Sequence, residues 1–377
     1  MSFPYTVKKG DYLELIARQH GLSSWRDIYF HPDNAAFRLK RPNPDKIFPG
    51  DVVMIPGTQP PGPPAPPPPE PVPPPLPPPA PPTRQETEQA IRTYLAREMR
   101  RDVASLLVDH EANLIVFGEI HFTFDPFKAF LLSELIRPVR ARRPNNTHFH
   151  ASERFPNDAS TRQQISNFLQ APPLERGRLM LQLSRPLQTF VPVLAMAADF
   201  PNRRYGVLPS DAIGVRGEDA RHAAIFNSFV NSAAACPDVP AGSINSSTSR
   251  GNILLGARHA ARRHVAGSAT PTVCGRLIDA GWKVHAVRLT VPHDPAGSVV
   301  PEDLELVMIG SSDKTPIDVL QIAHTVAAGR PFYADLTKSD SPFARLREAG
   351  SNAAEIPFNQ LFDAILHISA GTVPFPV

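Results

Sequence analysis

The chain has 377 residues, 42% of them hydrophobic and 20% charged, with a formal net charge of +3. This length can hold about two or three domains, and a small, scattered positive charge argues against nucleic-acid binding. Only two cysteines occur, Cys236 and Cys274, too few for a disulfide scaffold and without a metal-ligand spacing. We expect buried free thiols, with a single bridge as the alternative.

The N-terminal residues Met1–Tyr5 lack the basic start and the apolar run of a secretory signal, and no run of 18 or more apolar residues occurs. The sequence therefore predicts a chain with no membrane span that is cytoplasmic at synthesis. Action at an envelope or in a target cell would then require delivery by a specialised secretion system.

Residues 1–57 predict a small module with the order strand, helix, helix, strand. Tyr5–Val7 is the first expected strand, and Asp11 is the expected cap of a helix that runs to Ala17. Ser23 or Ser24 caps a second helix, and Asp51–Pro56 closes the module as a strand after a Pro-Gly turn.

This module resembles a LysM domain over its whole length. The landmarks, in order, are Tyr5–Asp11, Ile16-Ala17, Asn34, Ile47–Asp51 and Ile55-Pro56. The resemblance implies binding of N-acetylglucosamine-containing glycans such as peptidoglycan. The implied glycan-binding residues are Gly10, Asp11, Tyr12, Leu13, Asn43, Pro44 and Ile47. The stretch from His31 to Lys46 is longer than in a minimal LysM repeat. LysM modules also occur in phage-tail and contractile-injection proteins, so a secretion-apparatus protein is the alternative partner.

Residues 58–83 form a proline-rich linker, in which 17 of the 23 residues from Pro60 to Pro82 are proline. Because proline has a fixed φ and no amide donor, the run adopts extended polyproline II. At roughly 3.1 Å per residue it would span about 70 Å, so we expect a semi-rigid spacer between independently folded parts. A docking site for a proline-binding domain is the alternative.

Residues 84–377 predict one α/β domain with a mostly parallel sheet and helices on both faces, because strand and helix patterns alternate. A Thr83-x-x-Glu86 capping box is expected to open the first helix, along which Ile91, Leu95 and Met99 follow at helical spacing. The expected strands are residues 113–117, 148–152, 205–208, 253–255, 284–289, 304–309 and 332–336. The further expected helices are residues 126–140, a helical stretch up to residue 200 that breaks at Pro172-Pro173, residues 217–234 and residues 257–264.

Two Gly-x-x-His quartets follow strands of this domain, Gly118-Glu119-Ile120-His121 and Gly256-Ala257-Arg258-His259. The strand between them ends in Glu153-Arg154. Since loops at the carboxyl ends of parallel strands form the crevice of an open α/β sheet, we expect His121, Glu153 and His259 to lie within about 8 Å of one another. The candidate site residues are Glu119, His121, Glu153, Arg154 and His259, with Asp211 and Arg258 as further candidates.

These motifs resemble the superfamily that unites erythromycin esterases, ChaN-like haem-binding proteins and Tiki (TraB) metallopeptidases. The likeness extends from Asn113 to His264. Gly-Glu-x-His is shared with the esterase and ChaN branches, and paired Gly-x-x-His with an intervening Glu is typical of the Tiki branch. The resemblance implies a hydrolase of metal-dependent peptidase or esterase type, with a haem-binding protein as the alternative.

Two kinds of hydrolysis fit these residues. In the first, His121, Glu153 and His259 hold a divalent ion such as manganese, cobalt or zinc, and Glu119 is the general base. In the second, His121 or Glu119 activates water without a metal, Glu153 orients the histidine, and Arg154 or Arg258 stabilises the oxyanion.

A hydrolase carried to an envelope or an injection apparatus, as an effector or toxin, is therefore the first hypothesis. Haem is the less expected cofactor because no residue marks an axial ligand, and a non-catalytic tail-associated protein is the third alternative. Surface or structural positions are expected for the histidines without motif context, His222, His264, His285, His293, His324 and His367. His150, which alternates with His148 along a strand, is expected to be a packed core or sheet-face histidine.

Overall fold

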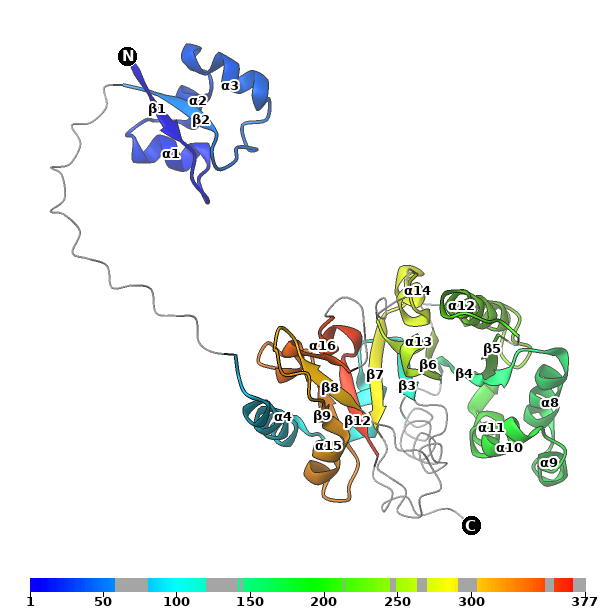
Figure 1. Ribbon diagram of the computed structural model, residues 1–377. Coiled ribbons are helices and arrows are strands. Elements are labelled where there is room, and N and C mark those ends of the chain that lie inside the picture. The colour runs from blue at the N-terminus through cyan, green and yellow to red at the C-terminus, as the bar shows by residue number, and fades with distance from the viewer. Residues whose placement is uncertain are drawn as a thin grey trace. The chain divides into compact units, whose positions relative to one another are not determined.

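The chain divides into two compact units, Met1–Pro79 and Ala80–Val377 (Figure 1). The computed structural model describes residues 1–57, 81–119, 142, 145–212, 214–244, 249–262, 270–290, 304–349 and 356–368. The linker predicted at residues 58–83 and the helix predicted at residues 126–140 lie wholly or largely outside this range. Among the described residues, no helix is long and apolar enough to cross a membrane.

In the N-terminal unit, two antiparallel strands, β1 (Ser2–Thr6) and β2 (Val52–Pro56), pack against short helices. The helices are α1 (Leu13–Gln19), α2 (Trp25–Tyr29), the 3-10 turn η1 (Pro32–Asn34) and α3 (Ala35–Lys40). The predicted order is confirmed, with η1 and α3 added in the long stretch from His31. Ser24 caps α2 through a capping box with Asp27, as one of the two predicted alternatives.

The predicted cap of the first helix is wrong. Helix α1 begins at Leu13, and its N-cap residue Tyr12 makes no side-chain capping hydrogen bond. The Asp11 carboxylate instead accepts hydrogen bonds from the Lys8 amide (2.7 Å) and the Tyr5 hydroxyl (2.8 Å). Asp11 therefore closes the turn before the helix, because a short acceptor chain can satisfy a backbone donor in that turn as readily as a helix end.

The added helix α3 is held to the unit by a buried carboxylate. Asp51 is 3% exposed and pairs with Lys40 Nζ and Arg41 Nε, each at 2.9 Å. The Arg41 hydrogen bond holds the pKa of Asp51 well below its usual range, against the effect of burial. The longer segment is thus an ordered part of the core-bearing unit.

The larger unit is built on a seven-stranded sheet in the order β10-β12-β7-β3-β6-β4-β5. The strands are β3 (Leu114–Glu119), β4 (Thr147–Pro156), β5 (Tyr205–Asp211), β6 (Ser249–Gly256), β7 (Val284–Thr290), β10 (Phe332–Asp335) and β12 (Ala364–His367). All neighbouring pairs are parallel except β10 with β12. The predicted fold class, a mostly parallel sheet flanked by helices, is confirmed.

Helices cover both faces of this sheet, because alternate residues of each strand point to opposite sides. In β3, Leu114 and Val116 join one core with helices α4 (Arg84–Glu98), α12 (Glu218–Ala234) and α14 (Val273–Asp279). Ile115 and Phe117 join the other core. The helices of this second face are α5 (Val103–Asp109), α8 (Ala159–Gln170), α10 (Arg185–Thr189) and α11 (Val191–Ala198). Figure 1 shows α12 and α14 on one side and α10 and α11 on the other.

The remaining short elements are α9 (Pro173–Met180), η3 (Pro201–Arg203), α13 (Ala257–Ala260), α15 (Val319–Ala327), η4 (Pro342–Arg345) and α16 (Phe358–Leu361). The helical stretch breaks at Pro172-Pro173 and the Thr83/Glu86 capping box opens α4, both as predicted.

Two expectations about secondary structure differ from the observed fold. Strand β8 (Glu305–Met308) lies in a separate antiparallel sheet between β9 (Ile317–Asp318) and β11 (Leu346–Glu348). Helix α13 ends four residues before the predicted His264, because Ala261 adopts an extended ψ of 137°.

Candidate functional site

The predicted site residues lie at the carboxyl ends of three neighbouring strands, β3, β6 and β4. In the sheet register, Glu119 at the end of β3 lies opposite Gly256 at the end of β6. Strand β4 pairs with the other edge of β6 as far as Ser152, directly before Glu153 and Arg154. The chain thus delivers the two quartets and the Glu-Arg pair to one edge of the sheet, as the parallel arrangement requires.

Gly118 lets the second quartet approach the first. A Cβ atom at this position would lie 3.0 Å from Ala260 Cβ and 3.2 Å from Ala257 Cα, closer than ordinary van der Waals contact. Glycine at this position therefore lets α13 pack directly on the end of β3 without a shift of the helix. This contact fixes His259, which belongs to α13.

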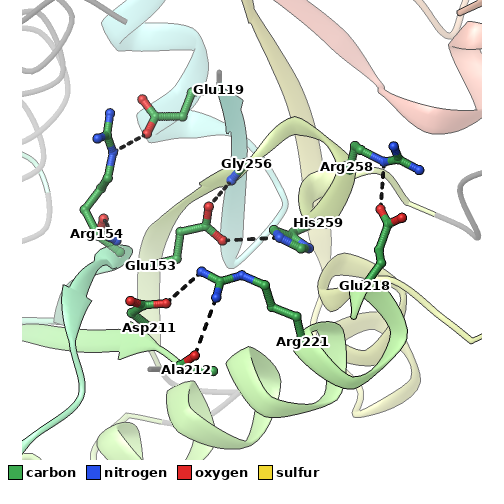
Figure 2. A network of polar contacts seen from close by, with 11 residues as sticks. Glu119, Glu153, Arg154, Asp211, Ala212, Glu218, Arg221, Gly256, Arg258 and His259 are labelled. Carbon is green, nitrogen blue, oxygen red and sulfur yellow. Dashed lines mark hydrogen bonds and ion pairs between the residues drawn. The ribbon is translucent and has the colours of Figure 1, made fainter. Parts of the chain in front are cut away.

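Glu153 connects the end of β4 to the second quartet (Figure 2). Its Oε1 atom accepts a hydrogen bond of 2.6 Å from the Gly256 amide, and its Oε2 atom lies 3.9 Å from His259 Nε2. The two side chains are buried, with Glu153 3% and His259 8% exposed. The structure therefore brings together two of the three residues expected within about 8 Å, while His121 lies outside the described residues.

Arg154 pairs with Glu119 and not with the adjacent Glu153. Arg154 Nε donates to Glu119 Oε1 at 2.9 Å, across the end of the intervening strand β6. Consecutive residues of a strand point to opposite faces, so Glu153 and Arg154 reach different partners. Glu119 is 1% exposed, and the guanidinium stabilises the charged form of a carboxylate that would otherwise be costly to bury.

The two further candidates, Asp211 and Arg258, lie beside this group in ion pairs with helix α12. Arg221 Nη2 donates to Asp211 Oδ1 at 2.8 Å, and Arg258 Nε lies 2.7 Å from Glu218 Oε1 (Figure 2). Burial raises the pKa of Asp211, Arg221 lowers it, and the nearby negative charge of Glu153 raises it. Asp211 is therefore electrostatically coupled to the site.

Helix α12 also supplies a residue that the sequence analysis treated as structural. The ring of His222 contacts the ring of His259 edge to face, with centroids 4.8 Å apart and an interplanar angle of 89°. His222 is fully buried, and burial lowers its pKa. The available signal was its place in the first turns of a helix that follows a parallel strand, since those turns lie at the carboxyl edge of the sheet.

Among the other histidines, His150 is the packed residue that was expected. It contacts Phe155 and Phe190, its Nδ1 bonds the Asn252 side chain, and burial lowers its pKa to about 4. The buried set also includes His148, His285 and His367, whereas His324 is exposed and both His264 and His293 lie outside the described residues. Cys236 and Cys274 are buried free thiols, as predicted.

A divalent ion was expected on His121, Glu153 and His259. The described residues supply the nitrogen and oxygen donors of two of these ligands, at 3.9 Å from each other. Within the part of the chain that the structure describes, no group of three or more histidine, cysteine, aspartate and glutamate side chains is arranged to hold a metal. The described residues alone therefore do not complete the predicted metal site.

The seven residues implied in glycan binding differ in what they offer a ligand. Tyr12 is 57% exposed, whereas Leu13 is 4% exposed and belongs to the core. Asn43 Oδ1 accepts the Asp45 amide at 2.9 Å, and Ile47 packs against the core. Gly10 has a φ of 95°, a left-handed conformation that favours glycine. Side-chain contact with a glycan at this loop would therefore centre on Tyr12.

Comparison with known proteins identifies the N-terminal unit and leaves the larger unit unassigned. The LysM domain family matches residues 5–26, so the chain carries a LysM domain at its N-terminus. Such a domain suggests binding to N-acetylglucosamine-containing glycans such as peptidoglycan. No curated protein matches the chain.

Three solved structures illustrate the likeness of the larger unit. A Campylobacter jejuni ChaN with cofacially bound haem is 9% identical, with a TM-score of 0.34, over 52% of this chain and 88% of that one. A Bacillus cereus protein is 10% identical, with a TM-score of 0.34, over 74% and 97%. RRSP, a MARTX toxin effector domain from Vibrio vulnificus, is 14% identical, with a TM-score of 0.32, over 57% and 40%. Likeness at this level supports no statement about function.

Proposed function

We propose that the larger unit is a hydrolase whose catalytic group is the His259–Glu153 pair. The observation that carries this proposal is the placement of a buried imidazole beside a buried carboxylate, 3.9 Å apart, at the carboxyl edge of a parallel sheet. A carboxylate that faces one ring nitrogen orients a histidine and stabilises its protonated form during proton transfer. Catalytic contacts of this kind commonly tighten when substrate binds.

In the metal-free form of this proposal each charged residue has one role. The Glu153 carboxylate is held by the Gly256 amide and faces His259 Nε2, so the proton on the ring resides at Nε2 and Nδ1 serves as the base. Water loses a proton to His259 and attacks the carbonyl carbon of an ester or amide. Arg154, held by Glu119, supplies positive charge at the same edge of the sheet for the developing oxyanion.

A divalent ion remains part of the proposal. His121, Glu153 and His259 would hold it, and when bound it would acidify the attacking water, with Glu119 as the base. His121 lies outside the described residues. The metal-free roles of Glu153, His259 and Arg154 do not depend on it. Metal analysis of the purified protein tests the ion, and an absorbance scan near about 400 nm tests haem as the alternative cofactor.

The LysM domain directs this activity in the proposal. It binds an N-acetylglucosamine-containing glycan of an envelope, or it docks the chain to an injection apparatus that delivers the hydrolase as an effector. The proline-rich run of residues 58–83 would act as the spacer.

Glu153→Gln in the full chain tests the hydrolase. The amide oxygen can still accept the Gly256 hydrogen bond, but the negative charge beside His259 is lost. We expect the rate with nitrophenyl esters, casein-derived peptides or peptidoglycan fragments to fall about 100-fold or more, with an unchanged melting temperature. Glu98→Gln is the matched control, since Glu98 is a paired carboxylate of α4 with a side chain 10% exposed.

Equal rates for the Glu153→Gln and Glu98→Gln variants on every hydrolysed substrate would contradict the catalytic role of the pair. A chelator that abolishes activity, together with loss of bound metal in Glu153→Gln, would select the metal-dependent form. An unaffected rate in chelator would select the metal-free form.

Glycan targeting is tested by sedimentation of the full chain with insoluble peptidoglycan. Tyr12→Ala should reduce the bound fraction because it removes the exposed aromatic side chain of the loop. Phe30→Ala is the control, since Phe30 is similarly exposed at 59% and lies outside the loops implied in glycan binding. Equal loss in both variants, or no binding by the native chain, would favour docking to a protein.

A further inference from the structure

The first turns of α12 contact the candidate site. This helix lies on the face of the sheet opposite to α10 and α11. Glu218 pairs with Arg258, His222 contacts His259, and Arg221 pairs with Asp211. Residues 218 and 222 are one helical turn apart, and they contact two consecutive residues of α13. Helix α12 therefore lies directly beside α13 and contacts His259 through His222.

His222 is unusual among these three residues of α12. Its side chain is fully buried, and neither ring nitrogen has a hydrogen-bond partner among the described residues. A buried polar group without a partner costs about 1–3 kcal/mol, and folded proteins rarely retain one. Phenylalanine would give the same edge-to-face contact with His259 at no such cost. Ring packing alone therefore does not explain a histidine at this position.

We propose that His222 binds the attacking water beside His259 and is a second catalytic histidine of the site. This inference rests on the proposed function. A neutral imidazole offers one acceptor and one donor, so the bare nitrogen of His222 accepts one hydrogen of the water while His259 Nδ1 accepts the other. The two rings lie in contact, which is close enough for one water molecule to reach both.

The chemical step is balanced with these two residues. The water oxygen forms a bond to the carbonyl carbon, and the water proton on the His259 side moves to Nδ1. Collapse of the tetrahedral intermediate then breaks the carbon–oxygen bond of an ester or the carbon–nitrogen bond of an amide, and the proton on His259 passes to the leaving group. His222 keeps its own proton throughout and orients the nucleophile.

The ionisable groups that face His222 come from three helices. They are Glu218 and Asp219 of α12, Arg258 and His259 of α13, and Arg276 of α14.

The His222→Phe variant keeps an aromatic ring but removes both ring nitrogens, so it tests the nitrogens apart from ring packing. The first measurement needs no substrate: in the full chain with isotope-labelled histidine, cross-relaxation between water and the ring protons of His222 should reveal a bound water. We expect that signal in the native protein, together with a nitrogen chemical shift of a hydrogen-bonded neutral ring. Absence of a bound water, or a nitrogen shift that reports a metal bond, would overturn the inference.

The second measurement is kinetic. We expect His222→Phe to lower kcat about 10–100-fold with KM changed less than about 2-fold, and with equal or higher thermal stability. His222→Gln, which restores a polar atom, should recover part of kcat. His150→Phe is the matched control, because His150 is also a buried histidine in an aromatic contact but lies in the other core, beside Phe155 and Phe190.

The two proposals fail differently. If Glu153→Gln and His259→Ala retain full rates, the catalytic role of the His259–Glu153 pair fails whatever His222 does. If those variants are inactive while His222→Phe keeps its native kcat and the native protein shows no water contact, only the role of His222 is wrong.

Discussion

Two pairs of histidine rings in contact lie at opposite ends of the sheet, and they differ in the hydrogen bonds that their nitrogens make. At the amino end of β7, His285 stacks on His110 with centroids 3.9 Å apart. Its Nε2 bonds the Tyr333 hydroxyl at 2.8 Å, and its Nδ1 lies 3.6 Å from Asp363. At the carboxyl end, His222 contacts His259 with centroids 4.8 Å apart, and neither nitrogen of His222 has a partner among the described residues.

The difference separates a structural histidine pair from the pair that we propose to be functional. Asp363 also accepts the Ala286 amide at 2.8 Å and pairs with Arg262, so the group around His285 is a connected polar network that holds β7 to β12. Fully bonded buried networks stabilise one packing arrangement. A buried histidine that has no hydrogen bond among the described residues is instead a candidate for binding a ligand.

The largest expected effect comes from comparing two alanine variants, one at a histidine of each pair. His259→Ala should reduce the hydrolytic rate about 100- to 10,000-fold and change the free energy of unfolding by less than about 1 kcal/mol. His285→Ala should do the reverse, with a rate per folded molecule near that of the native chain. Rate assays and urea unfolding of both variants check this. Similar losses of rate in the two variants would remove the distinction between the pairs.

Asp363→Ala should give the next largest effect, on stability alone. The substitution leaves the Ala286 amide, Arg262 and His285 without their shared carboxylate. We expect a loss of about 2–3 kcal/mol in the free energy of unfolding, less than for a fully buried pair because the Arg262 side chain is 33% exposed. Asp340→Ala, at a carboxylate 56% exposed in a surface pair with Arg97, is the control and should cost less than about 0.5 kcal/mol.

The structural pair should also make stability depend on pH. Burial, with the positive charges of His110 and Arg262, lowers the pKa of His285 to about 3. The unfolded chain therefore takes up a proton at higher pH than the folded chain, so stability is complete above about pH 6.5 and declines as the pH falls toward 3. His285→Gln should reduce the loss between pH 6 and pH 4 by up to about 2 kcal/mol. Urea midpoints across this range provide the measurement, and parallel curves for the two proteins would contradict it.

Sequence patterns predicted the elements that local chemistry specifies. The Thr83/Glu86 capping box and the apolar spacing after it are sufficient to define α4, and the helix expected at residues 217–234 is observed one residue shorter, with Gly217 as its N-cap. The parallel order of the sheet was enough to bring Glu153 to His259 and Glu119 to the same edge, because strand direction alone decides which ends meet. These predictions needed no knowledge of side-chain packing.

Other features depend on contacts between segments that are distant in the sequence. Strand β8 has the pattern of a sheet strand, but its pairing with β9 and β11 is decided by tertiary packing. Arg154 pairs with Glu119 and not with Glu153 because its side chain extends past the end of β6 to reach β3. His222 belongs to no sequence motif, and the role proposed for it depends on its contact with His259.

The smallest expected effect tests whether the close approach of the two quartets matters. Gly118→Ala places a methyl group 3.0 Å from Ala260 and 3.1 Å from Phe362, so α13 must move outward by a few tenths of an ångström. We expect a loss of about 1–2 kcal/mol in stability, typical of modest overpacking, and a rate lowered about 10-fold because His259 moves with the helix. Gly177→Ala, at a position with open space around its Cβ, is the control and should retain the native rate. If Gly118→Ala lost stability but kept its full rate, the position of His259 relative to β3 would be unimportant, and catalysis would depend on the ends of β6 and β4 alone.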